Sequence, residues 1–317
     1  MGRPRGPPTA WKTFIVNEQE IIRTAQRLMG PPPAGGVIVA IGDDCAVYRP
    51  HGSKEDLVFT TDMMHEGRHF LSETHTPQDI GYKAIARALS DIAAVGASPR
   101  FSLLSLALSA KTDQAWVEQF YKGYLSLAMA HGAPLIGGDT AKADAISCDV
   151  IVCGGVPRGK ALLRSGAKPG DGIFVSGELG GSALGLRTRT GAAWKRHVRP
   201  KPRLELGVHL RVNKIASACM DLSDGLSTDL HRLVKASGVS ADIEGPLPIF
   251  AGATLEEALH GGEDYELLFT APRKVRFGEE FEGLRLTRIG AVLKEGRTPV
   301  TWRGEPLPPL GWDHFSK

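Results

Sequence analysis

The chain has 317 residues, which is enough for two domains of ordinary size. Its apolar content of 42% and charged content of 23% are typical of a soluble globular protein, and the longest apolar stretch, near Phe101–Ala110, is too short and too rich in serine to span a bilayer. The net charge of +3, without any block of lysine and arginine, argues against a nucleic-acid-binding protein.

The first helix is signalled at both ends. Asn17 can cap it, Glu20 has the spacing of a capping box, and Gly30 followed by three prolines stops it. A second helix is predicted over Thr76–Val95, with a proline at its first helical position. The other elements expected in this half are a helix over Thr112–His131 and strands over Val37–Ile41, Leu57–Thr61, Arg100–Leu108, Pro134–Gly137 and Ile146–Val156.

The chain becomes basic and glycine-rich around Pro157–Gly170, and we place a domain boundary there, with domains over 1–156 and 157–317. The polar segment Gly191–Pro202 is predicted to be a mobile loop. The elements expected after the boundary are helices over Ser182–Thr190, Arg203–Arg211 and Leu226–Ser237 and strands over Ile173–Ser176, Ser217–Leu222, Val239–Ile243, Tyr265–Thr270, Leu286–Val292 and Val300–Trp302. Because strands and helices alternate irregularly in both halves, we expect a mixed α/β (α+β) fold.

The cysteines and the N-terminus favour a cytoplasmic protein. Cys45, Cys148, Cys153 and Cys219 form no CxxC pair, and two of them lie in apolar runs, so we expect buried thiols in a reducing compartment. The first ten residues lack the apolar segment of a signal peptide, and we expect a loose tail there.

Seven aspartates stand at the edges of apolar elements. They are Asp43, Asp44, Asp62, Asp91, Asp139, Asp221 and Asp224. Any one of them could cap a helix or a turn. If the fold gathers them, however, like charges about 4 Å apart repel by roughly 1 kcal/mol in water and about 4 kcal/mol at a protein surface. Such a cluster is stable around cations, oxygen ligands indicate Mg²⁺, and Mg²⁺ among several carboxylates usually means phosphate chemistry.

Three glycine-containing turns give weaker signals. Gly154–Lys160 matches GxxxxGK after a strand, but Ala161 stands where a P-loop needs Ser or Thr and Pro157 removes an amide, so an inter-domain turn is favoured. Gly177–Gly181 can bind an anion at a helix N-terminus or simply pack there. Ser223–Gly225 opens a helix, which its side chains can cap and whose free amides can face a phosphate. There is no GxSxG motif of a serine hydrolase.

The order of these and other motifs resembles one family, the thiamine-monophosphate kinases of the aminoimidazole ribonucleotide synthetase-like superfamily. The matching motifs are Ile41-Gly42-Asp43-Asp44, Thr60-Thr61-Asp62, Glu66–Phe70, Leu89-Ser90-Asp91, Gly137-Gly138-Asp139, Arg164–Ala167, Met220–Gly225, Gly261–Tyr265 and Gly311–Phe315. Single motifs are shared across the superfamily, whereas the whole series with its Gly-Trp-x-His-Phe tail is specific to this kinase.

The resemblance implies a two-domain PurM-like architecture. The N-terminal domain would bind metal and ATP and dimerise through its sheet, and the C-terminal domain would complete the active-site cleft. The implied reaction is the ATP- and Mg²⁺-dependent phosphorylation of thiamine monophosphate to thiamine diphosphate, the last step in making that product. The implied enzyme is a cytoplasmic homodimer with several Mg²⁺ ions in each site.

The resemblance also assigns residues, position by position. The implied magnesium ligands are Asp44, Thr60, Thr61, Asp62, Asp91, Asp139, Asp221 and Asp224. The implied ATP contacts are Tyr121, Gly138, Arg164 and Ser223, and the implied thiamine monophosphate contacts are His69, Glu263 and Trp312. Asp44, Asp91 and Asp221 are the expected catalytic acids.

The chemistry fits a site without a general base, because a phosphate monoester with a second pKa near 6 is already a dianion at pH 7.

Two alternatives to this function stay open at this point. One is another ATP-using enzyme of the same superfamily, which is disfavoured because no cysteine precedes Cys45 or stands near the C-terminus. The other is a non-catalytic regulator that binds a magnesium–nucleotide complex.

Overall fold

The computed structural model describes residues 18–31 and 35–313. Helix α1 (Glu18–Met29) belongs to one compact unit, and Pro33–Trp312 form the other. α1 confirms the first predicted helix, although its expected cap, Asn17, lies outside the described residues. No helix within the described ranges is long and apolar enough to cross a membrane.

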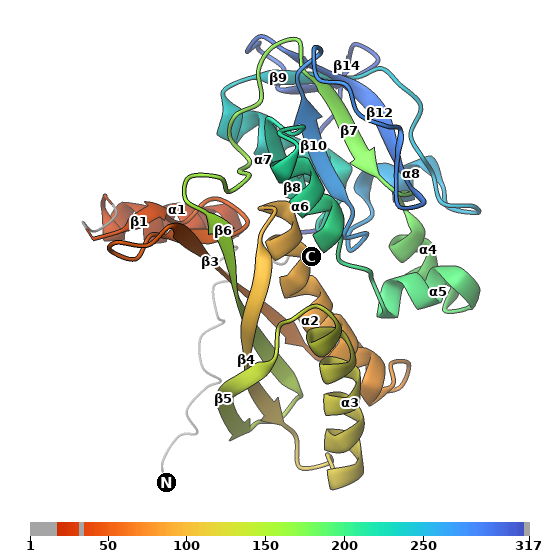
Figure 1. Ribbon diagram of the computed structural model, residues 1–317. Coiled ribbons are helices and arrows are strands. Elements are labelled where there is room, and N and C mark those ends of the chain that lie inside the picture. Colours follow the sequence, from red (N-terminus) through yellow and green to blue (C-terminus); the bar gives the residue numbers. More distant parts are fainter. Residues whose placement is uncertain (1–17, 32–34, 314–317) are drawn as a thin grey trace, which may run out of the picture. The chain divides into compact units, whose positions relative to one another are not determined.

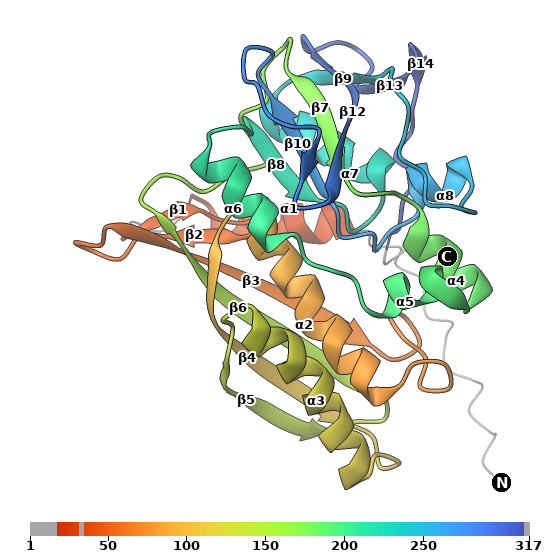
Figure 2. The same cartoon turned by 45° about the vertical axis from the view of Figure 1, so that its right-hand side comes forward.

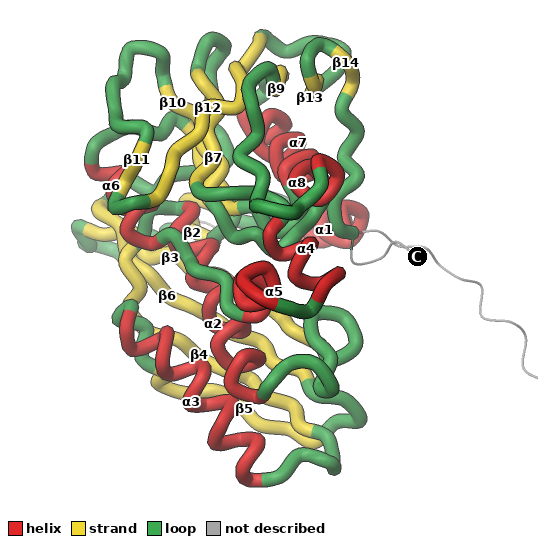
Figure 3. Tube along the Cα trace, turned by 90° about the vertical axis from the view of Figure 1, so that its right-hand side faces the viewer, coloured by secondary structure: helices red, strands yellow, loops and turns green. Residues whose placement is uncertain are grey.

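The first half of the larger unit is a six-stranded sheet with two helices on one face (Figures 1 and 2). Its strands are β1 (Val37–Val39), β2 (Ala46–Tyr48), β3 (Glu55–His65), β4 (Ser98–Leu108), β5 (Leu135–Lys142) and β6 (Ser147–Pro157), in the spatial order β1-β2-β3-β6-β4-β5. The two helices are α2 (Pro77–Ala94) and α3 (Gln114–Ala130), and Figure 3 shows them in front of these strands. Helix α2 starts as predicted, because Thr76 Oγ1 accepts the Asp79 amide at 3.1 Å and a proline follows the cap.

Side chains alternate along β3 between the two faces of this sheet. Val58, Thr60 and Met64 are buried toward α2. Thr61 and Met63 lie on the opposite face, which no helix of the larger unit covers in Figures 1 and 2. Thr60 and Thr61 of the Thr60-Thr61-Asp62 motif therefore lie on opposite faces of the sheet.

The second half is an eight-stranded sheet. Its strands are β7 (Gly172–Ser176), β8 (Ala218–Asp221), β9 (Ser240–Ile243), β10 (Leu267–Ala271), β11 (Glu280–Phe281), β12 (Leu284–Leu293), β13 (Val300–Trp302) and β14 (Glu305–Pro306). The main path runs β14-β13-β9-β12-β7-β10-β8, with β11 paired to β12. The helices of this half are α4 (Gly181–Thr188), α5 (Gly191–Val198), α6 (Leu204–Val212), α7 (Leu226–Ser237) and α8 (Leu255–His260). Helix α7 packs on β8, β9 and β13.

Helix α2 joins the two halves. It packs against the first sheet on one side and against α6 and β8, the edge strand of the second sheet, on the other. Helices α2 and α6 approach so closely at Gly207 that a Cβ there would come within 2.0 Å of the Ala93 carbonyl oxygen, so only glycine fits. The C-terminal end of β8 and the last turn of α2 meet at this junction.

One predicted element is wrong. The expected loop over Gly191–Pro202 contains helix α5, in which Ala193, His197 and Val198 are buried. The spacing of these three residues is that of a helix face. The sequence predicted a loop instead because the helix starts with a glycine, is rich in cationic residues and is followed by prolines. The short elements α8, β2, β11 and β14 were also not predicted.

Candidate active site

Three of the predicted metal ligands meet at the junction between the two halves. Asp44 comes from the segment before β2, Asp91 from the last turn of α2, and Asp221 from the end of β8. Each offers one carboxylate oxygen, and these oxygens all lie within 4.8 Å of one another. We call these three residues the acid cluster.

Neighbouring groups hold each carboxylate of the acid cluster in place. Thr60 Oγ1 donates to Asp91 Oδ2, and Ser90 Oγ donates to Asp221 Oδ2 at 2.6 Å. Arg164 donates to Asp44 Oδ1 from Nη2 at 2.5 Å and from Nε at 3.1 Å. Each of these carboxylates keeps a second oxygen to offer, which is what binding a shared cation requires.

The negative charges of the acid cluster also favour the binding of a cation. Burial, then repulsion from Asp221, raises the pKa of Asp91 well above its usual value, and burial, then repulsion from Asp44, does the same for Asp221. Burial, with help from Asp44, raises the pKa of Asp43 to about 6. Asp44 Oδ2 is buried and has no hydrogen-bond partner among the described residues. A buried carboxylate oxygen left in this state is costly unless a cation binds it.

Asp62 and Asp224 lie in ion pairs with arginines. Arg87 Nη2 donates to Asp62 Oδ1 at 2.9 Å, and Arg232 Nη1 donates to Asp224 Oδ2. The expected capping of α7 by Ser223 or Asp224 is wrong, because Asp229 Oδ2 accepts the amides of Asp224 and Gly225 from within the helix. This arrangement leaves the side chains of Ser223 and Asp224 outside the cap.

Four other predicted residues lie away from the acid cluster. Thr61 faces the opposite side of the first sheet, where its Oγ1 donates to Asp149 Oδ1 at 2.7 Å. Gly138 and Asp139 lie on β5, an edge strand separated from β3 by two strands, which is about 14 Å at the usual strand spacing. Tyr121 is half-buried on α3.

The predicted acceptor contacts gather beside the C-terminal end of β8. The Glu263 amide donates to the Ser223 carbonyl at 2.7 Å, and the Trp312 amide donates to the Asp224 carbonyl at 2.9 Å. His69 follows β3, and its backbone carbonyl accepts from Lys83, which also binds Glu263. The fold therefore brings these three contacts toward the same strand end as Asp221.

Lys83 and Arg87 on α2 were not predicted from the sequence, and Ser90 was recognised only as part of the Leu89-Ser90-Asp91 motif, without a role of its own. A visible signal existed, since Lys83, Arg87 and Asp91 recur every four residues in a helix that is otherwise mostly apolar. That spacing places them on one helix face. Asp149 was missed as well, and no motif marks it.

The two competing phosphate motifs are resolved. No helix follows Lys160, so Gly154–Lys160 is not a P-loop, and its first residues belong to β6. The turn before α4 does hold an anion, but the anion is the chain's own Asp264, whose carboxylate accepts the Gly180 amide at 2.6 Å and the Ser182 amide at 3.1 Å. Of the two possibilities left open for this turn, an internal carboxylate occupies the amides that could have bound an external anion.

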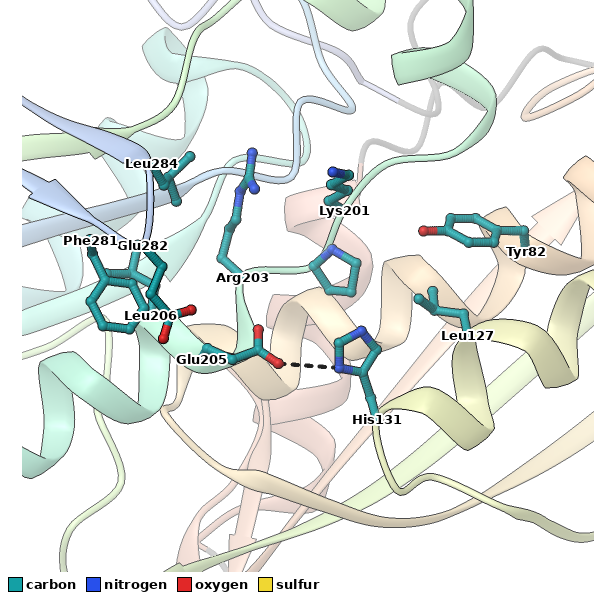
Figure 4. A pocket seen from close by; sticks show the side chains of 11 residues that line it. Tyr82, Leu127, His131, Lys201, Arg203, Glu205, Leu206, Phe281, Glu282 and Leu284 are labelled. Carbon is teal, nitrogen blue, oxygen red and sulfur yellow. Dashed lines mark ion pairs between the residues drawn. The ribbon is translucent and has the colours of Figure 1, made fainter.

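A pocket of about 280 Å³ opens elsewhere in the larger unit, between residues of α2 and α3 and residues near α6 and β11 (Figure 4). Its polar lining includes Tyr82, Lys201 and an ion pair of His131 Nδ1 with Glu205 Oε1 at 3.4 Å. Its lining residues include none of the site residues predicted from the sequence. The pocket is therefore separate from the site that the sequence predicts.

Known proteins match the chain over most of its length. The family models for the AIR synthase related protein match it with their N-terminal domain over residues 42–156 and with their C-terminal domain over residues 168–303. Thiamine-monophosphate kinase of Escherichia coli (strain K12) is 40% identical over 307 residues, covering 88% of this chain and 93% of that protein. Thiamine-monophosphate kinase of Bacillus subtilis (strain 168) is 38% identical over 313 residues, covering 88% and 94%.

A solved structure, AaThiL complexed with AMPPCP and TMP, has the same fold. It matches with a TM-score of 0.83 and 32% identity, covering 96% of this chain and 99% of that one. The predicted fold class, mixed α/β with a PurM-like pair of domains, is therefore confirmed. On the sequence matches and the fold together, the chain belongs to the thiamine-monophosphate kinase family.

Proposed function

We propose that this protein transfers the terminal phosphoryl group of ATP to thiamine monophosphate, giving thiamine diphosphate. The observation that carries this proposal is the acid cluster, in which Asp44, Asp91 and Asp221 meet from three distant parts of the chain. The named activity of the relatives, and the ATP analogue and TMP bound by AaThiL, support the choice of both substrates.

The acid cluster suits Mg²⁺, because its donors are all carboxylate oxygens and one of them, Asp44 Oδ2, is buried without a hydrogen bond from any described residue. Asp44, Asp91 and Asp221 would hold it, with Thr60, Asp62 and Asp224 nearby as further ligands. Bound Mg²⁺ supplies positive charge that offsets the repulsion between the phosphates of the two substrates. Thr60 and Ser90 orient the carboxylates through the hydrogen bonds that they donate.

The remaining assignments follow the family motifs. Arg164 and Ser223 lie beside the acid cluster and would contact ATP, as would Tyr121 and Gly138 from α3 and β5. At the acceptor, His69 would contact the phosphate. Glu263 would bind the acceptor as well. The partly exposed Trp312 would stack on the thiamine ring, whose cationic thiazolium favours an aromatic face.

The transfer is direct and in line. The hydroxyls of Thr60 and Ser90 both donate to carboxylates, so they are poorly placed to act as nucleophiles. The acceptor dianion needs no general base, whereas the hydroxyl of free thiamine would have to lose a proton. Catalysis then consists of positioning and charge stabilisation.

The enzyme is a homodimer that forms through the open face of the first sheet. Met63 on β3 and Ile136 on β5 are 62% and 61% exposed, so this sheet offers apolar side chains that a second copy of the chain would bury. Thr61 and Asp139 would then lie at or near the interface, which explains how family ligands can stand so far from the acid cluster. Light scattering that gives one chain's mass of 34.0 kDa at micromolar concentration would contradict this assembly.

Two further assignments complete the proposal. The domain boundary lies at the end of β6, with an N-terminal domain over 1–156 and a C-terminal domain over 157–317. The location is cytoplasmic, where ATP is available and where the four cysteines, all buried free thiols, stay reduced.

One assay tests the reaction. The purified protein is incubated with ATP, Mg²⁺ and thiamine monophosphate, and the products are separated by chromatography, with free thiamine as the control acceptor. We expect thiamine diphosphate from the monophosphate and no phosphorylated product from thiamine. Phosphorylation of thiamine at a comparable rate would mean that a general base operates in the site.

A further inference from the structure

A single lysine connects the proposed acceptor contacts of both halves. Lys83 lies in α2 with its side chain fully buried. Its Nζ donates to Glu263 Oε2 at 2.9 Å and to the His69 carbonyl at 3.4 Å. His69 follows a strand of the first sheet and Glu263 precedes β10 of the second, so one ammonium group contacts segments from both halves.

Glu263 is held from several directions at once. Its φ of +64° lies in the left-handed region, which residues other than glycine adopt only when their surroundings impose it. Its amide is bonded to the Ser223 carbonyl at 2.7 Å. Burial alone would raise the pKa of its carboxyl, but the positive charge of Lys83 and of neighbouring groups outweighs burial and lowers that pKa to about 2. The result is a fixed carboxylate beside the end of β8.

A second layer of side chains fixes the lysine itself. His197 Nε2 lies 3.5 Å from Lys83 Nζ, and His197 Nδ1 lies 2.9 Å from Ser182 Oγ. An ammonium can only donate, so Nε2 accepts and Nδ1 carries the proton that is donated to Ser182. Burial and the Lys83 charge lower the pKa of His197 to about 3, so the ring is neutral at physiological pH. The rings of His75 and Trp194 pack around it, with centroids 4.9–5.6 Å apart.

We infer that Lys83 is a positioning residue for the acceptor, which sets the Glu263 carboxylate and the His69 loop in the places from which they contact thiamine monophosphate. The inference rests on the proposed function, because it takes Glu263 and His69 as acceptor contacts. Lys83 needs no contact with the substrate to do this. Its effect should pass through Glu263 and appear in acceptor binding but not in ATP binding.

A double-mutant cycle tests this role. Lys83→Met keeps the length of the side chain and removes the charge, Glu263→Leu removes the partner, and the double variant replaces the whole ion pair by apolar groups, which buried sites tolerate better than a single unpaired charge. The matched control is Lys235→Met, which removes an exposed lysine from the last turn of α7. The readouts are the KM values for thiamine monophosphate and for ATP, kcat, and the rise in Tm on adding Mg²⁺.

We expect Lys83→Met and Glu263→Leu each to raise the KM for thiamine monophosphate by about 10-fold or more, with the KM for ATP and the Mg²⁺-dependent rise in Tm changed less than about 2-fold. The double variant should resemble Glu263→Leu alone, and Lys235→Met should resemble the wild type. The inference would be overturned if Lys83→Met left the KM for thiamine monophosphate unchanged, or if it raised the KM values for thiamine monophosphate and ATP equally. It would also be overturned if the rise in acceptor KM in the double variant equalled the product of the two single rises. A wild-type protein without activity on thiamine monophosphate would instead contradict the proposed function, so the two failures are distinguishable.

Discussion

We predict that removing one charge from the acid cluster stabilises the metal-free protein. Its carboxylate oxygens lie within 4.8 Å of one another. At that distance two full charges repel by about 3.5 kcal/mol at the effective dielectric constant of a protein surface and by about 0.9 kcal/mol in water. Asp91→Asn removes the charge that Asp91 adds and keeps an oxygen that can accept from Thr60. Between these two limits we expect a net gain of about 1–2 kcal/mol, or roughly 2–3 °C in Tm.

The assay is thermal unfolding at pH 8, in EDTA and in a series of Mg²⁺ concentrations. The unfolding free energy of the wild type should rise by about 2 kcal/mol at a Mg²⁺ concentration of about 30 times Kd, whereas that of Asp91→Asn should rise little. Asp144→Asn, an exposed acid in the turn between β5 and β6, is the matched control and should behave as the wild type in both media. An Asp91→Asn protein that is less stable than the wild type in EDTA, or equal stabilisation of both proteins by Mg²⁺, would contradict a repulsive, cation-binding acid cluster.

Three further predictions concern the substrates and the buried histidine. Trp312→Ala should raise the KM for thiamine monophosphate about 10-fold through loss of stacking on the thiazolium and leave the KM for ATP nearly unchanged in steady-state kinetics; equal changes in both would contradict the assignment. Incubation with γ-labelled ATP without acceptor, followed by acid quench, should leave the protein unlabelled, and a stable label on any side chain would rule out direct transfer. The pKa of His197 is lowered to about 3 from about 6.5, so its contribution to stability is present above pH 6.5 and is lost as the pH falls toward 3. Between pH 7.5 and 5, His197→Gln should therefore lose about 2 kcal/mol less unfolding free energy than the wild type in denaturant titrations, and parallel losses would show that the ring is not buried as a neutral group.

Local signals made much of the fold predictable. The proline after Thr76 and the glycine after α7 marked real helix ends, and α7 and β13 have the predicted bounds. Helix α5 was not predictable in the same way, because His197 is buried against His75 and Lys83 from a distant part of the chain, and the local composition of the helix favours a loop.

The candidate site was only partly predictable from local sequence. The aspartates at the edges of apolar elements indicated a cation site, but their meeting depends on α2 packing against both halves, which no spacing reveals. The opposite orientation of Thr60 and Thr61 did follow from the strand period and could have been stated from the sequence. For Lys83 the sequence gives only part of the answer. The four-residue spacing of Lys83, Arg87 and Asp91 places them on one helix face, but the contacts of Lys83 with His69 and Glu263 cannot be read from the sequence.

The most direct test of the central claim is to locate the metal. Mn²⁺ takes the same oxygen ligands as Mg²⁺ and scatters X-rays anomalously, so a crystal grown with Mn²⁺ and a non-hydrolysable ATP analogue reports the ion positions. The account predicts an anomalous peak at about 2–2.5 Å from carboxylate oxygens of Asp44, Asp91 and Asp221. Mn²⁺ bound to the nucleotide with no peak within reach of these three carboxylates would contradict the acid cluster as the metal site.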